Sequence, residues 1–115
     1  MLNAHGGNEF KPIVRDLSRR HEMLIVVANF YQMVPDELER TFDEPGDHAG
    51  EMETAFLLHV CPDLIVMEQA GEGRRIPFDL EGINQPGAWA PRPWSHTQPD
   101  TGSGDPRAAT AEKGR

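Results

Sequence analysis

The chain has 115 residues, which suits one small domain or a part of a larger one. Eleven basic side chains against 19 acidic ones give a formal net charge of −8, so we expect neither a nucleic-acid partner nor binding to an anionic membrane. The longest apolar run, Met23 to Ala28, is too short to span a bilayer, and we expect no signal peptide. The single cysteine, Cys61, excludes an internal disulfide framework, and we expect a cytoplasmic protein.

The first third of the chain predicts a strand, a helix and a second strand. Met1 and Leu2 are typical of a strand end that leads into the glycine-rich turn HGG. Apolar residues recur at helical spacing over residues 9–20, with Pro12 in the first turn. Residues 23–30, MLIVVANF, form an apolar run typical of a strand that is covered on both faces. This order predicts an α/β fold with a mainly parallel sheet.

The middle of the chain predicts two further helices. A short helix is expected over residues 35–40, and a clearer one over residues 50–60, which Pro62 ends. His59 shares the apolar face of the second helix, so we expect it in the core rather than at a metal.

The last part of the chain predicts a long loop and a final helix. Residues 71–104 are rich in glycine and proline, and a loop of this length is usually functional or disordered. Asp105 followed by Pro106 is typical of a helix start, so a helix is expected over the last ten residues.

Residues 5–8, HGGN, are the first candidate for chemistry. His5 follows a strand end, which is where open α/β sheets place ligand sites, and imidazole is the commonest metal ligand. Gly6 and Gly7 allow a close approach of the backbone to a ligand. The alternative is a tight turn with an incidental histidine, and the residues alone leave both interpretations open.

The second candidate is DHAGEMET, residues 47–54. His48 and Glu51 are three apart and face the same way on a helical turn. Glu51 and Glu53 are also favoured at a helix N-terminus by the helix dipole alone, so a capped helix explains both without chemistry. It does not explain His48, because a histidine cation is unfavourable at that position.

The long loop holds three side chains with open roles. Trp89 and Trp94 flank the sequence APRP, and they either pack over a pocket mouth or pin the loop. His96 follows in the same loop and fits either a site or a solvated turn.

Three segments together resemble the creatininase (creatinine amidohydrolase) family: NAHGGNEFKPIVRDL, GDHAGEMETAFLLHVCPDLI and TGSGDPRAATAEKG. Their order and spacing match over nearly the whole chain, which corresponds to the C-terminal part of a typical member. The resemblance implies part of a three-layer α/β/α domain over residues 1–115, in which residues 71–104 form a loop region. It also implies hydrolysis of a cyclic or linear small-molecule amide by a metal-bound water, and assembly into a homo-oligomer. The implied cofactors are divalent zinc, manganese or iron ions in a binuclear centre.

Residue by residue, the resemblance assigns roles to three side chains, and two more side chains are candidates for contact with the substrate. His5 matches the metal-ligand histidine that follows a strand, and His48 matches the histidine that transfers a proton. Glu51 matches an acidic residue near the metals and is a possible ligand. Asn8 and Trp94 are expected to contact the substrate.

The chain departs from the family at two points. Gly6 and Gly7 stand where creatininase proper has a tyrosine and a ligand glutamate, which argues against creatinine as the substrate. Nothing in the chain corresponds to the family's N-terminal glutamate, histidine and bridging aspartate, and a catalytic zinc normally has about three protein ligands. The alternative hypothesis is therefore a catalytically incomplete fragment, or a binding and assembly module with exposed strand edges.

Overall fold

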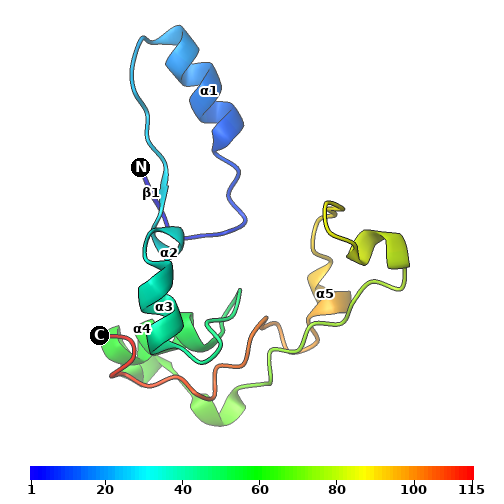
Figure 1. The fold of residues 1–115 in the computed structure, drawn as a ribbon. Coiled ribbons are helices and arrows are strands. Elements are labelled where there is room, and N and C mark those ends of the chain that lie inside the picture. The colour runs from blue at the N-terminus through cyan, green and yellow to red at the C-terminus, as the bar shows by residue number, and fades with distance from the viewer. The chain divides into compact units, whose positions relative to one another are not determined.

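The structure is a computed structural model that describes residues 1–115. The chain forms two units, residues 1–38 and residues 39–115, each of which is described by itself. The elements in chain order (Figure 1) are β1 (Leu2–Asn3), α1 (Lys11–Arg20), β2 (Ala28–Asn29), α2 (Phe30–Met33), α3 (Pro35–Thr41), α4 (Glu51–Val60), the 3₁₀ turns η1 (Pro62–Leu64), η2 (Met67–Gln69) and η3 (Glu81–Asn84), and α5 (Trp94–Thr97). Every helix is too short or too polar to cross a membrane.

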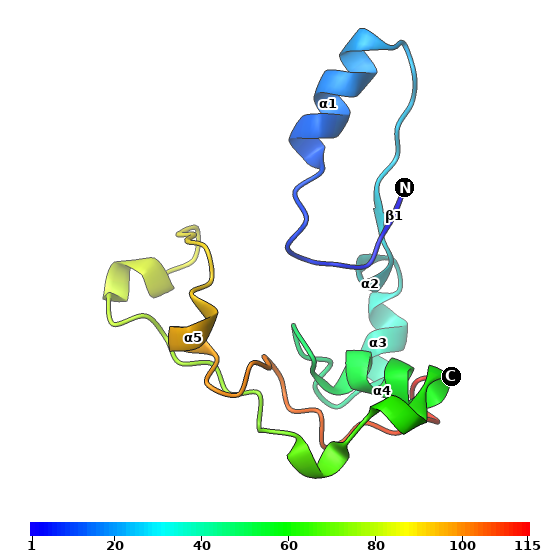
Figure 2. The same cartoon turned by 180° about the vertical axis from the view of Figure 1, so that it is seen from behind.

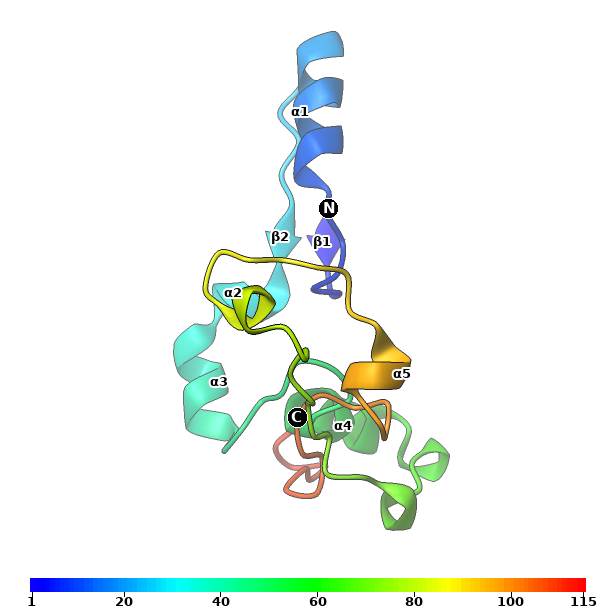
Figure 3. The ribbon, with the colours of Figure 1, turned by 90° about the vertical axis from the view of Figure 1, so that its right-hand side faces the viewer.

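The first unit is organised around a pair of parallel strands. Leu2 of β1 lies opposite Ala28 of β2, and Figure 3 shows the two strands side by side. Helix α1 connects them, because parallel strands need a crossover. Pro12 lies at its start, and Arg19 and Arg20 lie in its last turn, where the helix dipole favours cations. The predicted order of strand, helix and parallel strand is therefore confirmed.

The apolar run of residues 23–30 behaves differently from the prediction. Only Ala28 and Asn29 form a strand, while Leu24 is 90% exposed and Val26 is 58% exposed. The expected strand covered on both faces is wrong, because β1 pairs with two residues of the run and no second layer covers the rest. Apolar composition predicted an extended segment but could not specify its neighbours.

The second unit has a small core beside helix α4. Its buried apolar side chains are Phe42, Met52, Ala55 and Ala109. The end of the chain runs alongside α4 (Figures 1 and 2), and a Cβ on Gly114 would lie 2.0 Å from the carbonyl oxygen of Ala55. Only glycine permits this backbone contact, so the last turn of the chain packs directly on α4.

Two other expectations for the second unit are wrong. His59 is exposed, because the core covers the first half of α4 and not its last turn. Asp105 accepts a hydrogen bond from the Arg107 N–H (2.9 Å), as a capping residue should, but the chain continues as turns instead of a helix. Packing against α4 overrides the local helix signal here. Residues 71–104 are mostly irregular, as predicted, and contain only η3 and α5.

Candidate functional site

The HGGN turn is held by Asn3, a side chain that is only 5% exposed. Its Oδ1 accepts hydrogen bonds from the His5 N–H (3.2 Å) and from Nδ2 of Asn8 (2.9 Å). Its Nδ2 donates to the carbonyl oxygen of His5 (2.9 Å) and to Oδ1 of Asn29 (2.8 Å). The backbone of His5 is thus fixed on both sides of the residue. We did not predict this role from the sequence, although a polar residue between an apolar strand and HGGN was the available signal.

The imidazole of His5 folds back over the glycines of the turn. A Cβ on Gly7 would lie 3.0 Å from Nε2 of His5, so any larger residue at position 7 would push the ring away. Gly6 and Asn8 line an adjacent hollow of about 380 Å³ within the first unit. His5 is exposed, and the predicted substrate residue Asn8 borders this hollow while its amide nitrogen is bonded to Asn3.

The backbone of His48 is pinned in the second unit by Ser103. The His48 N–H donates to the carbonyl oxygen of Ser103 (3.1 Å), and the Ser103 N–H donates to the carbonyl oxygen of His48 (2.8 Å). The two residues form an isolated antiparallel bridge. Beside it, a Cβ on Gly104 would lie 2.5 Å from Cα of Gly46, so the two chain segments are in backbone contact. The loop that carries His48 therefore has little room to move.

Glu53 caps the start of α4. Its Oε2 accepts a hydrogen bond from the Ala49 N–H (2.6 Å), which satisfies a donor just before the helix. Ala49 has a φ of +49°, which is uncommon for a residue other than glycine. The structure therefore gives Glu53 a capping role, one of the two roles that the sequence left open.

The structure brings the predicted residues His48 and Trp94 together. Their ring centroids are 4.7 Å apart, with an interplanar angle of 60°. The guanidinium of Arg92 also lies over the indole, with its Cζ 4.6 Å from the ring centroid. Arg92 Nη2 donates to Oδ2 of Asp47, the residue before His48. His48 is half-buried, so a group of a substrate can reach its imidazole.

Glu51 has different partners from those expected. The residue is 1% exposed, its Oε1 accepts a hydrogen bond from Nζ of Lys113, and its Oε2 accepts one from the Glu44 N–H (2.9 Å). Lys113 Nζ also bonds Oδ2 of Asp43 (3.0 Å). The hydrogen bond to Glu51, and then the one to Asp43, raise the pKa of Lys113. Glu51 thus joins helix α4 to the preceding loop and to the end of the chain.

The side chains of this chain do not by themselves fit a complete metal centre. His5 offers an exposed imidazole, but both carboxylate oxygens of Glu51 are bonded to a cation and to a backbone amide. No group of three or more histidine, cysteine, aspartate or glutamate side chains is arranged to hold a metal ion. A ligand role for Glu51 would require Lys113 to leave, and that role stays a prediction.

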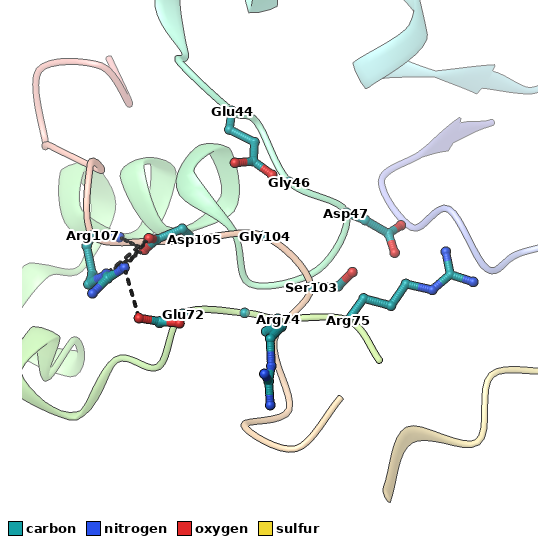
Figure 4. A pocket seen from close by; sticks show the side chains of 11 residues that line it. Glu44, Gly46, Asp47, Glu72, Arg74, Arg75, Ser103, Gly104, Asp105 and Arg107 are labelled. Carbon is teal, nitrogen blue, oxygen red and sulfur yellow. Dashed lines mark hydrogen bonds and ion pairs between the residues drawn. The ribbon is translucent and has the colours of Figure 1, made fainter. Parts of the chain in front are cut away.

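A polar hollow of about 650 Å³ is lined in part by Gly46 and Asp47 (Figure 4). Arg107 is bonded to Asp105 and lies 3.7 Å from Glu72. Arg74 and Arg75 extend in different directions in Figure 4, so the cations of the hollow do not converge on one point. The hollow therefore lacks the convergent polar groups that mark a ligand site.

The fold and these loops define an α/β protein of the creatininase type. A family model described as creatinine amidohydrolase (Creatininase) matches residues 1–115, so the chain belongs to the creatininase family. A crystal structure of a candidate creatinine amidohydrolase from Bacteroides fragilis NCTC 9343 is similar, with 41% sequence identity and a TM-score of 0.86. The match covers 98% of this chain and 45% of that one, so the chain spans less than half the length of this relative. No curated protein matches the chain.

These comparisons confirm two predictions made from the sequence. The resemblance to the creatininase family is confirmed by the family match over all 115 residues. The α/β fold class is confirmed by the parallel strand pair and by the likeness to the Bacteroides fragilis protein. The individual roles of His5, His48, Glu51, Asn8 and Trp94 are not tested by the comparisons and stay predictions.

Proposed function

We propose that the chain contributes to the active site of an amidohydrolase that cleaves a C–N bond in a small cyclic or linear amide. The family match over the whole chain supports this reaction class. The observation that carries the proposal within the structure is His48, whose backbone is fixed by Ser103 and whose ring stays half-buried beside an indole.

In this proposal His48 moves a proton during hydrolysis. Water adds to the carbonyl carbon and the C–N bond breaks, so one proton of the water must reach the leaving nitrogen. An imidazole can accept that proton from the attacking water and give it to the nitrogen, which is general base and then general acid catalysis. Trp94 provides a flat apolar wall beside the imidazole, and a planar amide can pack against it.

We also propose that the reaction depends on a divalent metal, with zinc, manganese and iron as the candidates that family membership suggests. Of the two proposed metal ligands in this chain, His5 and Glu51, only His5 has an exposed side chain. Metal analysis tests this point: we expect His5→Ala to retain less zinc or manganese than the unaltered chain, with His21→Ala as the control. Equal metal content in both variants would refute the assignment of His5.

The reaction is tested by a screen of cyclic and linear amides. His48→Ala should lower turnover by about 10²- to 10⁴-fold. His59→Ala should leave it unchanged, because His59 is exposed in the last turn of α4. The same variants should be made in a chimaera, in which the 115 residues replace the matched part of the Bacteroides fragilis protein. Absence of hydrolysis from both the chain and a folded chimaera would refute the proposed reaction.

A second candidate function is assembly, and the exposed apolar side chains of the first unit favour it. Leu2 is 72% exposed and Leu24 is 90% exposed, so large apolar side chains of the first unit face solvent. We propose that a second copy of the chain covers them, in agreement with the homo-oligomer that the family resemblance implies.

Sedimentation velocity tests the assembly. The variant Leu24→Asp with Val26→Asp should dissociate the oligomer. The control Leu64→Asp should not, because Leu64 is also exposed but lies in the second unit. A chain that stays monomeric at all concentrations would contradict this candidate.

A further inference from the structure

Arg92 is the least expected participant in the surroundings of His48. It lies 45 residues after Asp47 in sequence, yet its guanidinium bonds the Asp47 carboxylate. The same guanidinium lies over the indole of Trp94, which in turn contacts His48. One side chain therefore connects the loop before α4 with the start of α5.

The two ends of α5 are held by different means. At its C-terminal end, Thr97 and Gln98 are buried, and the carbonyl oxygen of Thr97 accepts a hydrogen bond from the Ile76 N–H (2.8 Å). Residues 84–89, which precede its N-terminal end, are exposed, and Trp89 is 85% exposed, while Arg92 and Pro93 are half-buried. The position of Trp94 at the N-terminal end therefore depends on the contacts that Arg92 makes.

We propose that Arg92 is a positioning residue that holds the indole of Trp94 against the imidazole of His48. The ion pair with Asp47 fixes the guanidinium to the loop that carries His48, and the stacking contact fixes the indole to the guanidinium. Arg92 thereby fixes the orientation of the indole beside His48. The inference rests on the proposed function for the role of His48, while the contacts themselves are measurable without turnover.

Tryptophan fluorescence measures the contact between His48 and Trp94. Trp89→Phe leaves Trp94 as the single tryptophan, since the chain has two. A protonated imidazole quenches a neighbouring indole, and histidine changes its charge between about pH 5 and 8. We expect the emission of Trp94 to fall as the pH is lowered through this range, and His48→Ala to abolish the change.

Other ionisable groups near the pair need controls. Arg92 lies over the indole and bonds Asp47, Glu53 caps the backbone beside His48, and His96 lies on α5 two residues after Trp94. His96→Gln should preserve the transition. If His96→Gln removes the change in emission and His48→Ala does not, Trp94 is not in contact with His48 and the inference fails.

The decisive variant is Arg92→Gln in the single-tryptophan chain. Loss of a cation–π contact and of an exposed ion pair should shift the ratio of stacked to open Trp94 by about three- to tenfold, with a matching loss of quenching amplitude. Arg92→Lys should restore part of the amplitude, because lysine keeps the charge but not the planar group. Asp47→Asn should also lower the amplitude of quenching. The double variant should lose less than the sum of the two single losses, because the two residues form one ion pair.

Arg107→Gln is the matched control, because Arg107 is also an ion-paired arginine of the second unit. Its partners are Asp105 and Glu72. The inference would be overturned if Arg92→Gln and Arg107→Gln, both shown to be folded by circular dichroism, had the same amplitude of Trp94 quenching. In an active preparation, Arg92→Gln should also raise KM for planar amides more than it lowers kcat. Absence of turnover from both the unaltered chain and the folded chimaera would refute the proposed function and leave the fluorescence result to decide on Arg92.

Discussion

At the scale of single residues, the site depends on hydrogen bonds that hold its backbone in place. Asn3 fixes the backbone of His5, Ser103 fixes that of His48, and Glu53 caps Ala49. Asn3 and Ser103 are buried, so their polar groups must be satisfied, and each restricts the conformation of its loop. The histidines stay accessible while their main chains are fixed.

Ala49 provides a prediction at this scale. Its positive φ places its Cβ in a disfavoured position directly after His48. Ala49→Gly should therefore raise the free energy of unfolding by about 0.5–1 kcal/mol, measured by urea denaturation. Val27→Gly serves as a contrast, because Val27 has no positive φ and should lose stability. A destabilised Ala49→Gly chain would contradict the strained backbone described for this loop.

The sequence predicted single residues where the signal was local. His48 and Trp94 were both singled out, and the structure brings their rings together. Lys113 was not, because it lies 62 residues from Glu51 and no spacing rule connects them. Arg92 was missed for the same reason, although it separates the two prolines of the segment APRP.

At the scale of elements, local periodicity predicted α1 and α4 within one or two residues. It failed for the last ten residues, where the Asp105–Pro106 start signal is present but Gly114 and Lys113 pack the chain onto α4 as turns. It also failed for the run of residues 23–30, because pairing with β1 decides how much of the run becomes a strand. Both failures come from contacts between distant segments.

The junction of α4 with the end of the chain gives a prediction for Glu51 and Lys113. Lys113→Met leaves the carboxylate of Glu51 buried without its cation, and it should lower the thermal midpoint by roughly 5–15 °C. Adding Glu51→Gln removes the charge but keeps an acceptor for the Glu44 N–H, so the double variant should recover at least about half of the loss.

This cycle also separates two roles of Glu51. A structural ion pair predicts that Glu51→Gln rescues Lys113→Met, whereas a metal ligand predicts no rescue. Arg20→Met serves as the control, because its ion pair with Asp16 is exposed and should change the midpoint little. Equal midpoints for Lys113→Met and the double variant would show that the two side chains are not coupled.

At the scale of the whole molecule, two ion pairs make the stability depend on pH. Hydrogen bonds from the side chain and backbone of Arg107 lower the pKa of Asp105 to about 2. The stability from Asp105 is therefore present above its ordinary pKa of about 4 and is lost as the pH falls toward 2. The raised pKa of Lys113 acts at the other end, since its contribution is present below about pH 10.4 and is lost as the pH rises through the raised value.

Urea denaturation at a series of pH values checks this window. The midpoint should stay nearly constant between about pH 5 and 10 as far as these two groups are concerned. Asp105→Asn should flatten the fall below pH 4, and Lys113→Met should flatten the fall above pH 10. Unaltered slopes in both variants would assign the pH dependence to other groups.

The central claim is that His48 transfers the proton in amide hydrolysis by this creatininase-family chain. Chemical rescue in the chimaera with the Bacteroides fragilis protein tests it most directly. We predict that His48→Ala lowers kcat by about 10²- to 10⁴-fold and that added imidazole restores part of the rate. A His48→Ala chimaera that hydrolyses amides as fast as the unaltered one would contradict the claim.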